Sequence, residues 1–554
     1  MVFYKNYPLK DSRSIFFIIL IGGVLYIPFL GHVHLFDWDE INFAESAREM
    51  LVSGNYLDVQ INFEKFWEKP PLFIWLQALS MKLFGINEFA ARFPNAIVGI
   101  LSLISLFLIG KNIKDTKFGL IWTAIYASSI LPFLYFKSGI IDPLFNLFIF
   151  LGIYFFYQFS KDQKSSLLKI FLSASFIGLG ILTKGPVALL LFGLTAFVYM
   201  LIKKQYKKYI SFKLLLPYIL IVSLVGGFWF ILQYFNGNKQ VLVDFIEYQI
   251  RLFSTKDAGH GGFLLYHFVI ILIGVFPASI FALKGFKSLK EEIKLHDFHL
   301  WMRILFWVVL ILFTIVSTKI AHYSSLAYFP VSFLASYYIY YWLENKKTIP
   351  NWLNALIVLI ASIWALVVIA IPIVGKNARK IIESQLIHDS FTNANLEADV
   401  HWSGYESLIG VFFLVSSIGF IYFIPDKKKK IIGILVSSIL FTYSTLIIIA
   451  PKIEGYSQGA LIEFYQKHAK ENAYFSTYGL KNYAQYFYAD IPIRKSNSNA
   501  SLEWYRTGKT NKTVYIVTRN NKAIDFIKKY PNFAKLYEKN GFVFFQKIDL
   551  HDKK

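Results

Sequence analysis

Long apolar runs separated by short polar connections dominate the chain from Ser14 to Ala450. Each run is long enough for a helix to cross the ~30 Å hydrocarbon core of a bilayer. The pattern therefore predicts a polytopic α-helical membrane protein with about thirteen spans. We expect them near residues 14–31, 92–110, 118–136, 141–159, 167–183, 186–202, 213–235, 263–283, 301–317, 323–343, 352–374, 405–424 and 430–450.

Alternate connections between the expected spans are rich in lysine. They contain Lys111, Lys114, Lys117, Lys161, Lys164, Lys203, Lys204, Lys207, Lys208, Lys284, Lys287, Lys290, Lys294, Lys346, Lys347 and Lys427–Lys430. All of them fall on the same side as the N-terminus, and positive connections mark the cytoplasmic side. The other side then carries the longer polar segments 32–91, 236–262 and 375–404 and the tail.

The outer segments predict structure of their own. Residues 72–84 place Trp75, Leu79 and Leu83 at helical spacing, which predicts an interfacial helix in the first loop. The tail alternates strand patterns at 473–478, 513–517 and 542–546 with helical patterns at 459–470 and 522–529. We therefore divide the chain into a transmembrane domain, residues 1–450 with the outer loop 32–91, and a small outer α/β domain, residues 451–554.

Composition supports this class of protein. Of the 554 residues, 56% are hydrophobic and 17% are charged, which excludes an ordinary soluble domain. The net charge of +22 follows from the cytoplasmic connections and does not require a nucleic-acid partner. The chain has no cysteine, which excludes disulfides, thiolate metal sites and thiol nucleophiles.

Carboxylates at the outer membrane boundary are the first candidates for chemistry. Asp39 and Glu40 follow the first span, and Asp142 begins the fourth. Carboxylates are costly to hold near hydrocarbon and usually serve function there. The alternative for Asp39 and for Asp142 is a helix N-terminal cap.

Cations and a histidine are expected at the same depth. Glu68 and Lys69 precede two prolines, His260 lies in a glycine-rich loop, and Lys184, Lys319 and Tyr323 lie at span ends. A lysine at this boundary suits a phosphate. The alternatives are a surface ion pair for Glu68–Lys69, an ordinary loop residue for His260 and a snorkelling side chain for Lys319.

Ordered motifs link these residues to a known family. They are Asp39-Glu40, Ala44-Glu45, Arg48-Glu49-Met50, Ser53-Gly54, Glu68-Lys69-Pro70-Pro71, Trp75, Leu83-Phe84-Gly85, Arg92, Asp142-Pro143, Leu182-Thr183-Lys184-Gly185, Asp257-Ala258-Gly259-His260, Lys319, Tyr323 and Pro330. In this order they resemble the aminoarabinose (4-amino-4-deoxy-L-arabinose) lipid A transferases, within the protein O-mannosyltransferase-like GT-C superfamily.

The resemblance implies an integral-membrane, inverting glycosyltransferase. It would move a sugar from an undecaprenyl phosphate carrier to lipid A or another cell-envelope acceptor, on the periplasmic face of the bacterial inner membrane. The implied roles are catalytic for Asp39, Asp142 and Glu40, donor-phosphate binding for Lys69, Arg48, Lys319 and Tyr323, and metal binding for Glu68 and His260.

Cofactors follow from the same resemblance. One divalent ion, zinc or magnesium or manganese, would lie near the carrier, although two protein ligands are few for zinc, which takes about four including water. No nucleotide cofactor is expected, because the sugar arrives on a lipid. The phosphate leaves as an anion, and cations beside it would stabilise the developing charge.

Two departures leave the sugar and the acceptor open. Gly261-Gly262 follows His260 where a proline-aromatic stretch is usual, and Ala321-His322 precedes Tyr323 where proline and a small polar residue are usual. An alternative acceptor is a protein Ser/Thr hydroxyl. A third hypothesis, a lipid-linked-sugar transporter, predicts inverted repeats with broken helices at the midplane, whereas the sequence contains no recognisable internal repeat.

Overall fold

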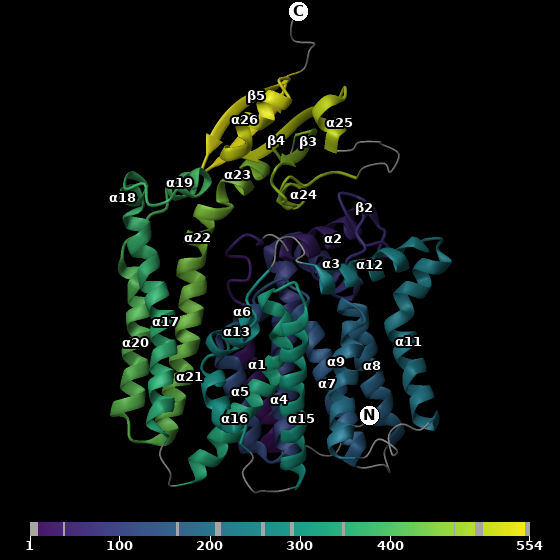
Figure 1. Cartoon of the computed structure of the whole chain (residues 1–554), viewed down its shortest axis with the longest axis vertical. Helices are drawn as coiled ribbons and strands as arrows, with labels where there is room; N and C mark the ends of the chain where they lie inside the picture. Colours follow the sequence, from purple (N-terminus) through teal and green to yellow (C-terminus); the bar gives the residue numbers. More distant parts are fainter. Residues whose placement is uncertain are drawn as a thin grey trace, which may run out of the picture.

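The computed structural model describes residues 9–36, 39–161, 166–204, 212–255, 261–287, 293–345, 349–469, 471–493 and 502–548. Most of these residues are helical. Figure 1 shows the long helices side by side, with the strands β3–β6 beyond one of their ends. Helices α2, α3 and α12 lie across that same end, between the long helices and the strands.

Eight helical segments among the described residues are long and apolar enough to cross a membrane. They are α4 (Glu88–Ile113), α7 (Asp142–Lys161), α8 (Ser166–Lys184), α11 (Phe212–Phe235), α15 (Ile293–Ile315), α17 (Asn351–Lys376), the run Tyr405–Phe423 that contains α20 (Leu408–Ile418), and the run Lys427–Ser457 that contains α21 (Lys427–Ser444) and α22 (Ala450–Ser457). This confirms a polytopic α-helical membrane protein.

Two expected spans are bent rather than straight. The pair α5 (Thr116–Ser128) and α6 (Ile130–Phe136) turns by 75°, and the pair α13 (Tyr266–Gly274) and α14 (Ala278–Gly285) turns by 110°. Non-helical residues separate the two helices of each pair: Ser129 in the first pair and Val275–Pro277 in the second. Counting each bent pair as one span gives at most ten spans by length and composition.

The three remaining expected spans form helices that are too short or too charged to count among the eight. They are α1 (Leu9–Tyr26), α9 (Val187–Ile202) and α16 (Tyr328–Glu344), of 18, 16 and 17 residues. The first of these includes Lys10, Asp11 and Arg13 near its start. The number thirteen thus exceeds the eight to ten spans that the described helices support.

The first outer segment folds as a compact cover. It contains α2 (Asp39–Ser53), a hairpin of β1 (Gln60–Ile61) and β2 (Glu64–Lys65), and α3 (Leu72–Phe84), which has the bounds expected from its periodicity. Helix α2 packs on α3, and α3 packs on α4. A second outer helix, α12 (Gln240–Ser254), lies at the same end of the long helices (Figure 1), and the 3-10 turn η2 (Ala321–Ala327) packs on α7 and α15.

The C-terminal part contains a four-stranded sheet in the order β3-β4-β6-β5. Its elements are α23 (Gly459–Lys467), β3 (Ala473–Tyr478), α24 (Ala484–Tyr488), α25 (Leu502–Thr507), β4 (Thr513–Arg519), α26 (Asn520–Lys529), β5 (Phe533–Lys539) and β6 (Phe542–Lys547). Strands β3 and β4 are parallel, and the other pairs are antiparallel. The three expected strands and both expected helices are confirmed within a few residues.

Strand β5 was not expected, because only Phe533 of its seven residues is buried. An edge strand of this kind lacks the alternating apolar pattern. Two short helices, α18 (Ala378–Glu383) and α19 (Ser390–Leu396), lie beside this region, and α19 packs on α26. The division of the chain at residue 451 stays a prediction, since α22 continues the last long helix to Ser457.

Candidate active site

A cavity of about 580 Å³ lies where the outer segments meet the long helices. Its polar lining is Asp39, Glu40, Glu68, Lys69, Arg92, Tyr135, Lys137, Ser138, Asp142, Lys184, Tyr248, Gln249, Arg251, His322, Tyr323 and Lys481. The rest of the lining is mainly apolar, including Phe43, Phe145 and Leu252. A cavity with apolar walls and a few convergent charges is the usual form of a binding site for an amphipathic ligand.

Asp142 and Lys184 form one charged pair in this cavity. Asp142 is the first residue of α7 and Lys184 the last residue of α8, and those two helices pack along their length. The Lys184 Nζ donates to Asp142 Oδ1 at 2.5 Å, and Asp142 is only 2% exposed. The same ammonium lies 5.0 Å from the centre of the Tyr323 ring. A lysine that was expected only as a span-end residue therefore neutralises one of the three expected carboxylates.

Asp39 is the more accessible carboxylate. It begins α2, and 32% of its side chain is exposed, against 3% for Asp142. Both carboxylates approach the His322 ring, whose Nε2 lies 3.5 Å from Asp39 Oδ2 and 3.9 Å from Asp142 Oδ2. The arrangement brings together two expected acidic residues that are far apart in the sequence.

Positive charge gathers around Tyr248 of α12. The Lys69 Nζ donates to the Tyr248 hydroxyl at 3.1 Å and lies 4.5 Å from the ring centre. The Arg251 guanidinium lies 5.1 Å from the centre of the same ring. Glu68, next to Lys69, also lines the cavity. An ammonium and a guanidinium in an apolar cavity are suited to an anionic phosphate.

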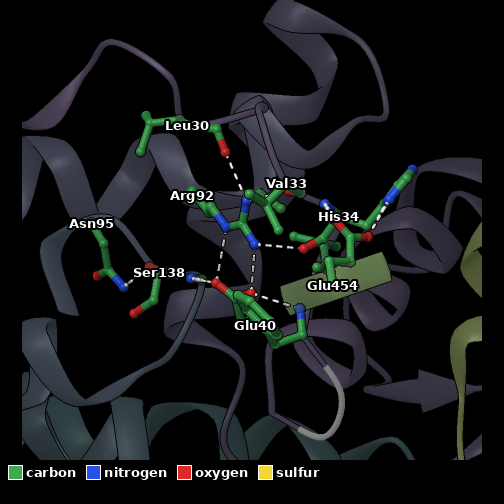
Figure 2. Close-up of polar contacts among 12 residues, drawn as sticks. Leu30, Val33, His34, Glu40, Arg92, Asn95, Ser138 and Glu454 are labelled. Atoms are coloured by element: carbon green, nitrogen blue, oxygen red, sulfur yellow. Dashed lines mark hydrogen bonds and ion pairs between the residues drawn. The ribbon is translucent and has the colours of Figure 1, made fainter. Parts of the chain in front are cut away.

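Glu40 is held by a buried network, although it follows Asp39 directly (Figure 2). Its two oxygens accept hydrogen bonds from Arg92 of α4 at 3.0 and 2.8 Å, and from the backbone N–H groups of Phe36 and Gly139. Burial alone would raise the pKa of Glu40, but the Arg92 guanidinium and these N–H groups hold it below its ordinary value. Arg92 also donates to three carbonyls of the first loop, those of Leu30, Val33 and His34.

Arg48 and Lys319, both expected near the donor phosphate, point elsewhere. The guanidinium of Arg48 pairs with Glu45 at 2.8 Å and reaches Asp490 and the carbonyl of Ile491 in the C-terminal part. Lys319 donates to the carbonyls of Phe313, Thr314 and Val316, at and just beyond the end of α15. Neither side chain belongs to the cavity lining, because carbonyls and a carboxylate already take up their donors.

Known proteins resemble this chain in sequence and in fold. The family described as dolichyl-phosphate-mannose-protein mannosyltransferase matches residues 68–229. Undecaprenyl phosphate-alpha-4-amino-4-deoxy-L-arabinose arabinosyl transferase 1 of Proteus mirabilis is 26% identical over 323 residues, which cover 57% of each chain. An uncharacterized protein of Aquifex aeolicus is 27% identical over 368 residues, covering 64% of this chain and 68% of that protein.

The crystal structure of ArnT from Cupriavidus metallidurans bound to undecaprenyl phosphate has the same fold. It superposes with a TM-score of 0.73 over 97% of this chain and 98% of ArnT, at 15% sequence identity. The chain therefore has the fold of ArnT and is similar in sequence to the arabinosyl transferases. Its alignments with the two Proteus mirabilis relatives span 57% and 48% of their lengths.

The family match covers only part of the cavity. Lys69, Asp142 and Lys184 lie inside residues 68–229, whereas Asp39, Tyr323 and His322 lie outside. The sequence singled out His322 as a departure from the family and did not assign it to the site. Tyr248 and Arg251 were also missed, because neither belongs to a recognised motif.

The metal expectation falls partly outside the residues that the structure describes. Glu68 lines the cavity, but His260 belongs to residues 256–260, which the structure does not describe. Among the residues that are described, no group of three or more His, Asp or Glu side chains could hold a metal ion. The described side chains alone do not form a metal site, and no chemical step is assigned to a metal.

Proposed function

We propose that this protein is an integral-membrane glycosyltransferase that moves a sugar from undecaprenyl phosphate to lipid A or a related envelope acceptor. The observation that carries the proposal is the cavity, which sets Asp39 and Asp142 against Lys69, Lys184 and Arg251 at one end of the bundle. The similarity to the arabinosyl transferase of Proteus mirabilis and to ArnT crystallised with undecaprenyl phosphate supports this donor. A lipid-linked donor requires no nucleotide.

Lys69 and Arg251 form the donor end in this proposal. When the bond from the sugar to the carrier phosphate breaks, its electron pair stays on the phosphate oxygen. Cations already in place stabilise this charge without reorganisation, which is commonly the largest catalytic contribution. The apolar part of the lining suits the first isoprenyl units of the carrier.

Asp39 forms the acceptor end. A new bond forms between the acceptor oxygen and the sugar carbon that the phosphate leaves, with inversion at that carbon. If the acceptor is a hydroxyl, Asp39 takes its proton; if it is an ionised phosphate, Asp39 orients it. Asp142 keeps Lys184 in place beside Tyr323, so it acts on the geometry of the site.

Glu40 supports the site in this proposal and does not react. Its oxygens are occupied by Arg92 and two backbone N–H groups. These bonds fasten the start of α2, and therefore Asp39, to α4 and to the turn before α7. Arg48 and Lys319 likewise support neighbouring elements.

We place the cavity on the periplasmic face of the bacterial inner membrane, with a cytoplasmic N-terminus and the C-terminal sheet outside. The support is the distribution of lysine. The connections that contain Lys111–Lys117, Lys203–Lys204 and Lys284–Lys287 follow helices that run away from the cavity end. Positive connections of this kind remain on the cytoplasmic side.

The direct test measures transfer in membranes that contain the full chain. Radiolabelled undecaprenyl phosphate-aminoarabinose is incubated with extracted lipid A, and label in lipid A is counted. We expect Asp39→Ala and Lys69→Ala to lower transfer by about 100-fold or more, the range of a lost base or charge contact. Glu64→Ala and Lys82→Ala remove an exposed carboxylate and an exposed ammonium outside the cavity lining and should transfer normally. Full transfer by both cavity variants would exclude this site assignment.

A protein hydroxyl is the second candidate acceptor, favoured by the family match to protein mannosyltransferases. The same incubation discriminates the two acceptors, because label then appears in protein and resists extraction with the lipids.

A further proposal is one divalent ion bound with the help of Glu68 and His260. Elemental analysis of the purified protein should show less zinc, magnesium or manganese in His260→Ala than in the wild type, and equal contents would remove the ion from the proposal.

A further inference from the structure

His322 occupies the space between the two carboxylates of the cavity. It is the second residue of η2, and its carbonyl accepts a hydrogen bond from the Ser325 hydroxyl at 2.5 Å. The ring packs edge-on against Tyr323, with 5.3 Å between ring centres, and only 15% of the side chain is exposed. The imidazole is therefore fixed by its own turn and by a neighbouring cavity residue.

The Nε2 atom of His322 lies near one carboxylate oxygen of Asp142 and one of Asp39. Asp142 Oδ1 is occupied by Lys184, but Asp142 Oδ2 is buried and has no hydrogen-bond partner within the described part of the chain. That oxygen lies 3.9 Å from Nε2, and Asp39 Oδ2 lies 3.5 Å from it. Both separations exceed a good N–H···O hydrogen bond by less than 1 Å. Catalytic hydrogen bonds are often this long before substrate is bound.

We propose that His322 is a positioning residue for the transfer reaction, whose Nε2 hydrogen links Asp39 to Asp142 and orients the Asp39 carboxylate toward the acceptor. The inference rests on the proposed function. A hydrogen bond to Oδ2 of Asp39 leaves Oδ1 for the acceptor, as a base must be held within reach of the proton it takes. The same hydrogen gives Asp142 Oδ2 a partner when the cluster closes around substrate.

The charges around His322 favour its neutral form. Burial lowers the pKa of the imidazole below its ordinary value; Asp142 on α7 and Asp39 on α2 raise it, while Lys184 on α8 and Lys69 before α3 lower it. Tyr323 and His267 on α13 are further titratable groups beside the ring. A neutral imidazole donates one hydrogen and weakens Asp39 as a base less than a charged imidazolium would.

At low pH the His322 imidazole becomes charged. Because the pKa of His322 is depressed, it gains a second proton only at a pH below the ordinary histidine value of about 6.5, and a full positive charge then forms beside Asp39. The carboxylate is then held more tightly as an anion and accepts a proton less readily. Transfer by the wild type should therefore decline on the acid side as His322 takes up this proton.

Two variants separate hydrogen donation from titration. His322→Gln keeps an N–H donor but cannot gain a charge, and His322→Leu removes both. With undecaprenyl phosphate-aminoarabinose and lipid A, we expect His322→Leu to lower kcat by about 30-fold with KM for the donor unchanged within threefold. We expect His322→Gln to recover most of kcat and to shift the acid limb of the pH profile to lower pH. His388→Gln, an exposed histidine far along the chain, is the matched control.

Thermal unfolding of the purified variants and their binding of undecaprenyl phosphate show that each variant is folded. A wild-type kcat in folded His322→Leu, or an unshifted acid limb in His322→Gln, would overturn the inference. Absence of transfer by the wild type to either lipid or protein would instead count against the proposed function. The two failures are thus distinguishable in one set of measurements.

Discussion

Burial decides the charge of Glu49, a single residue on the inner face of α2. Its side chain is fully buried beside Glu45, which pairs with Arg48. Burial, followed by the negative charge of Glu45, raises the pKa of Glu49 above its ordinary value. The folded protein therefore keeps a proton on this carboxyl at a pH where the unfolded chain, with a glutamate pKa of about 4.3, has lost it.

Stability should consequently fall as pH rises from about 5 to 8, since the stabilisation from a raised pKa is complete below the unfolded pKa and is lost as pH rises toward the folded pKa. Glu49→Gln fixes the neutral form in both states. We expect its Tm to exceed that of the wild type by an amount that grows from pH 5 to pH 8. Differential scanning calorimetry in detergent measures this, and Glu64→Gln at an exposed position is the control. An increment that is constant with pH would contradict the prediction.

Residue-scale chemistry was only partly predictable from the sequence. Asp39, Lys69, Asp142 and Tyr323 were expected at a site, and the structure brings them to one cavity. The sequence could not separate Asp39 from Glu40, because the partner that occupies Glu40 lies 52 positions away in α4. Arg48 and Lys319 were assigned by motif, whereas their donors are taken by groups that only the folded chain brings near.

At the scale of elements, the hydropathy pattern located the helices but did not show where two of the expected spans bend. The apolar runs at 118–136 and 263–283 are continuous in composition, and each folds as two helices with a sharp bend. A hydropathy pattern reports how much apolar surface a segment has, and two short helices bury as much as one long helix. The close packing that fixes the bent pairs is visible only in the structure.

Gly285 shows this packing at the end of α14. A methyl group at this position would overlap the backbone carbonyl of Leu334 on α16, and a backbone atom cannot rotate away. We expect Gly285→Ala to destabilise the protein by about 1–3 kcal/mol, the usual cost of overpacking. Gly193→Ala on α9, where nothing lies within 4 Å, is the matched control and should be neutral or slightly stabilising. Thermal unfolding of both variants measures the difference, and equal Tm values would refute it.

At the scale of the whole molecule, the C-terminal part is fastened to the first outer loop. The Tyr488 hydroxyl accepts from the Leu35 N–H at 2.7 Å, and Gln458 donates to the Leu35 carbonyl at 2.9 Å. Arg48 of α2 reaches Asp490 and Ile491. These contacts bring Lys481 to the cavity. The sequence showed that the tail has strands, but no local pattern could show which loop they meet.

Arg48 should be the critical residue of this attachment. Its truncation to Ala leaves Glu45 buried without its cation, a change that costs about 3–5 kcal/mol in comparable buried pairs. Asp490, by contrast, is 74% exposed, and exposed pairs contribute about 0–1 kcal/mol. We expect Arg48→Ala to speed proteolysis between residues 451 and 493 and to lower transfer, and Asp490→Asn to change neither. Limited proteolysis with mass mapping checks the prediction, and identical cleavage rates would overturn it.

The cavity lining runs from Phe29 to Lys481 in a chain of 554 residues. Synthesis proceeds from the N-terminus, so Asp39, Lys69 and Asp142 leave the ribosome long before the last wall of the cavity exists. The cavity is complete only after the final long helix has formed and the segment around Lys481 has folded against the first loop. A half-made chain therefore carries these carboxylates without the complete cavity, and the order of biosynthesis decides when a ligand can first bind there.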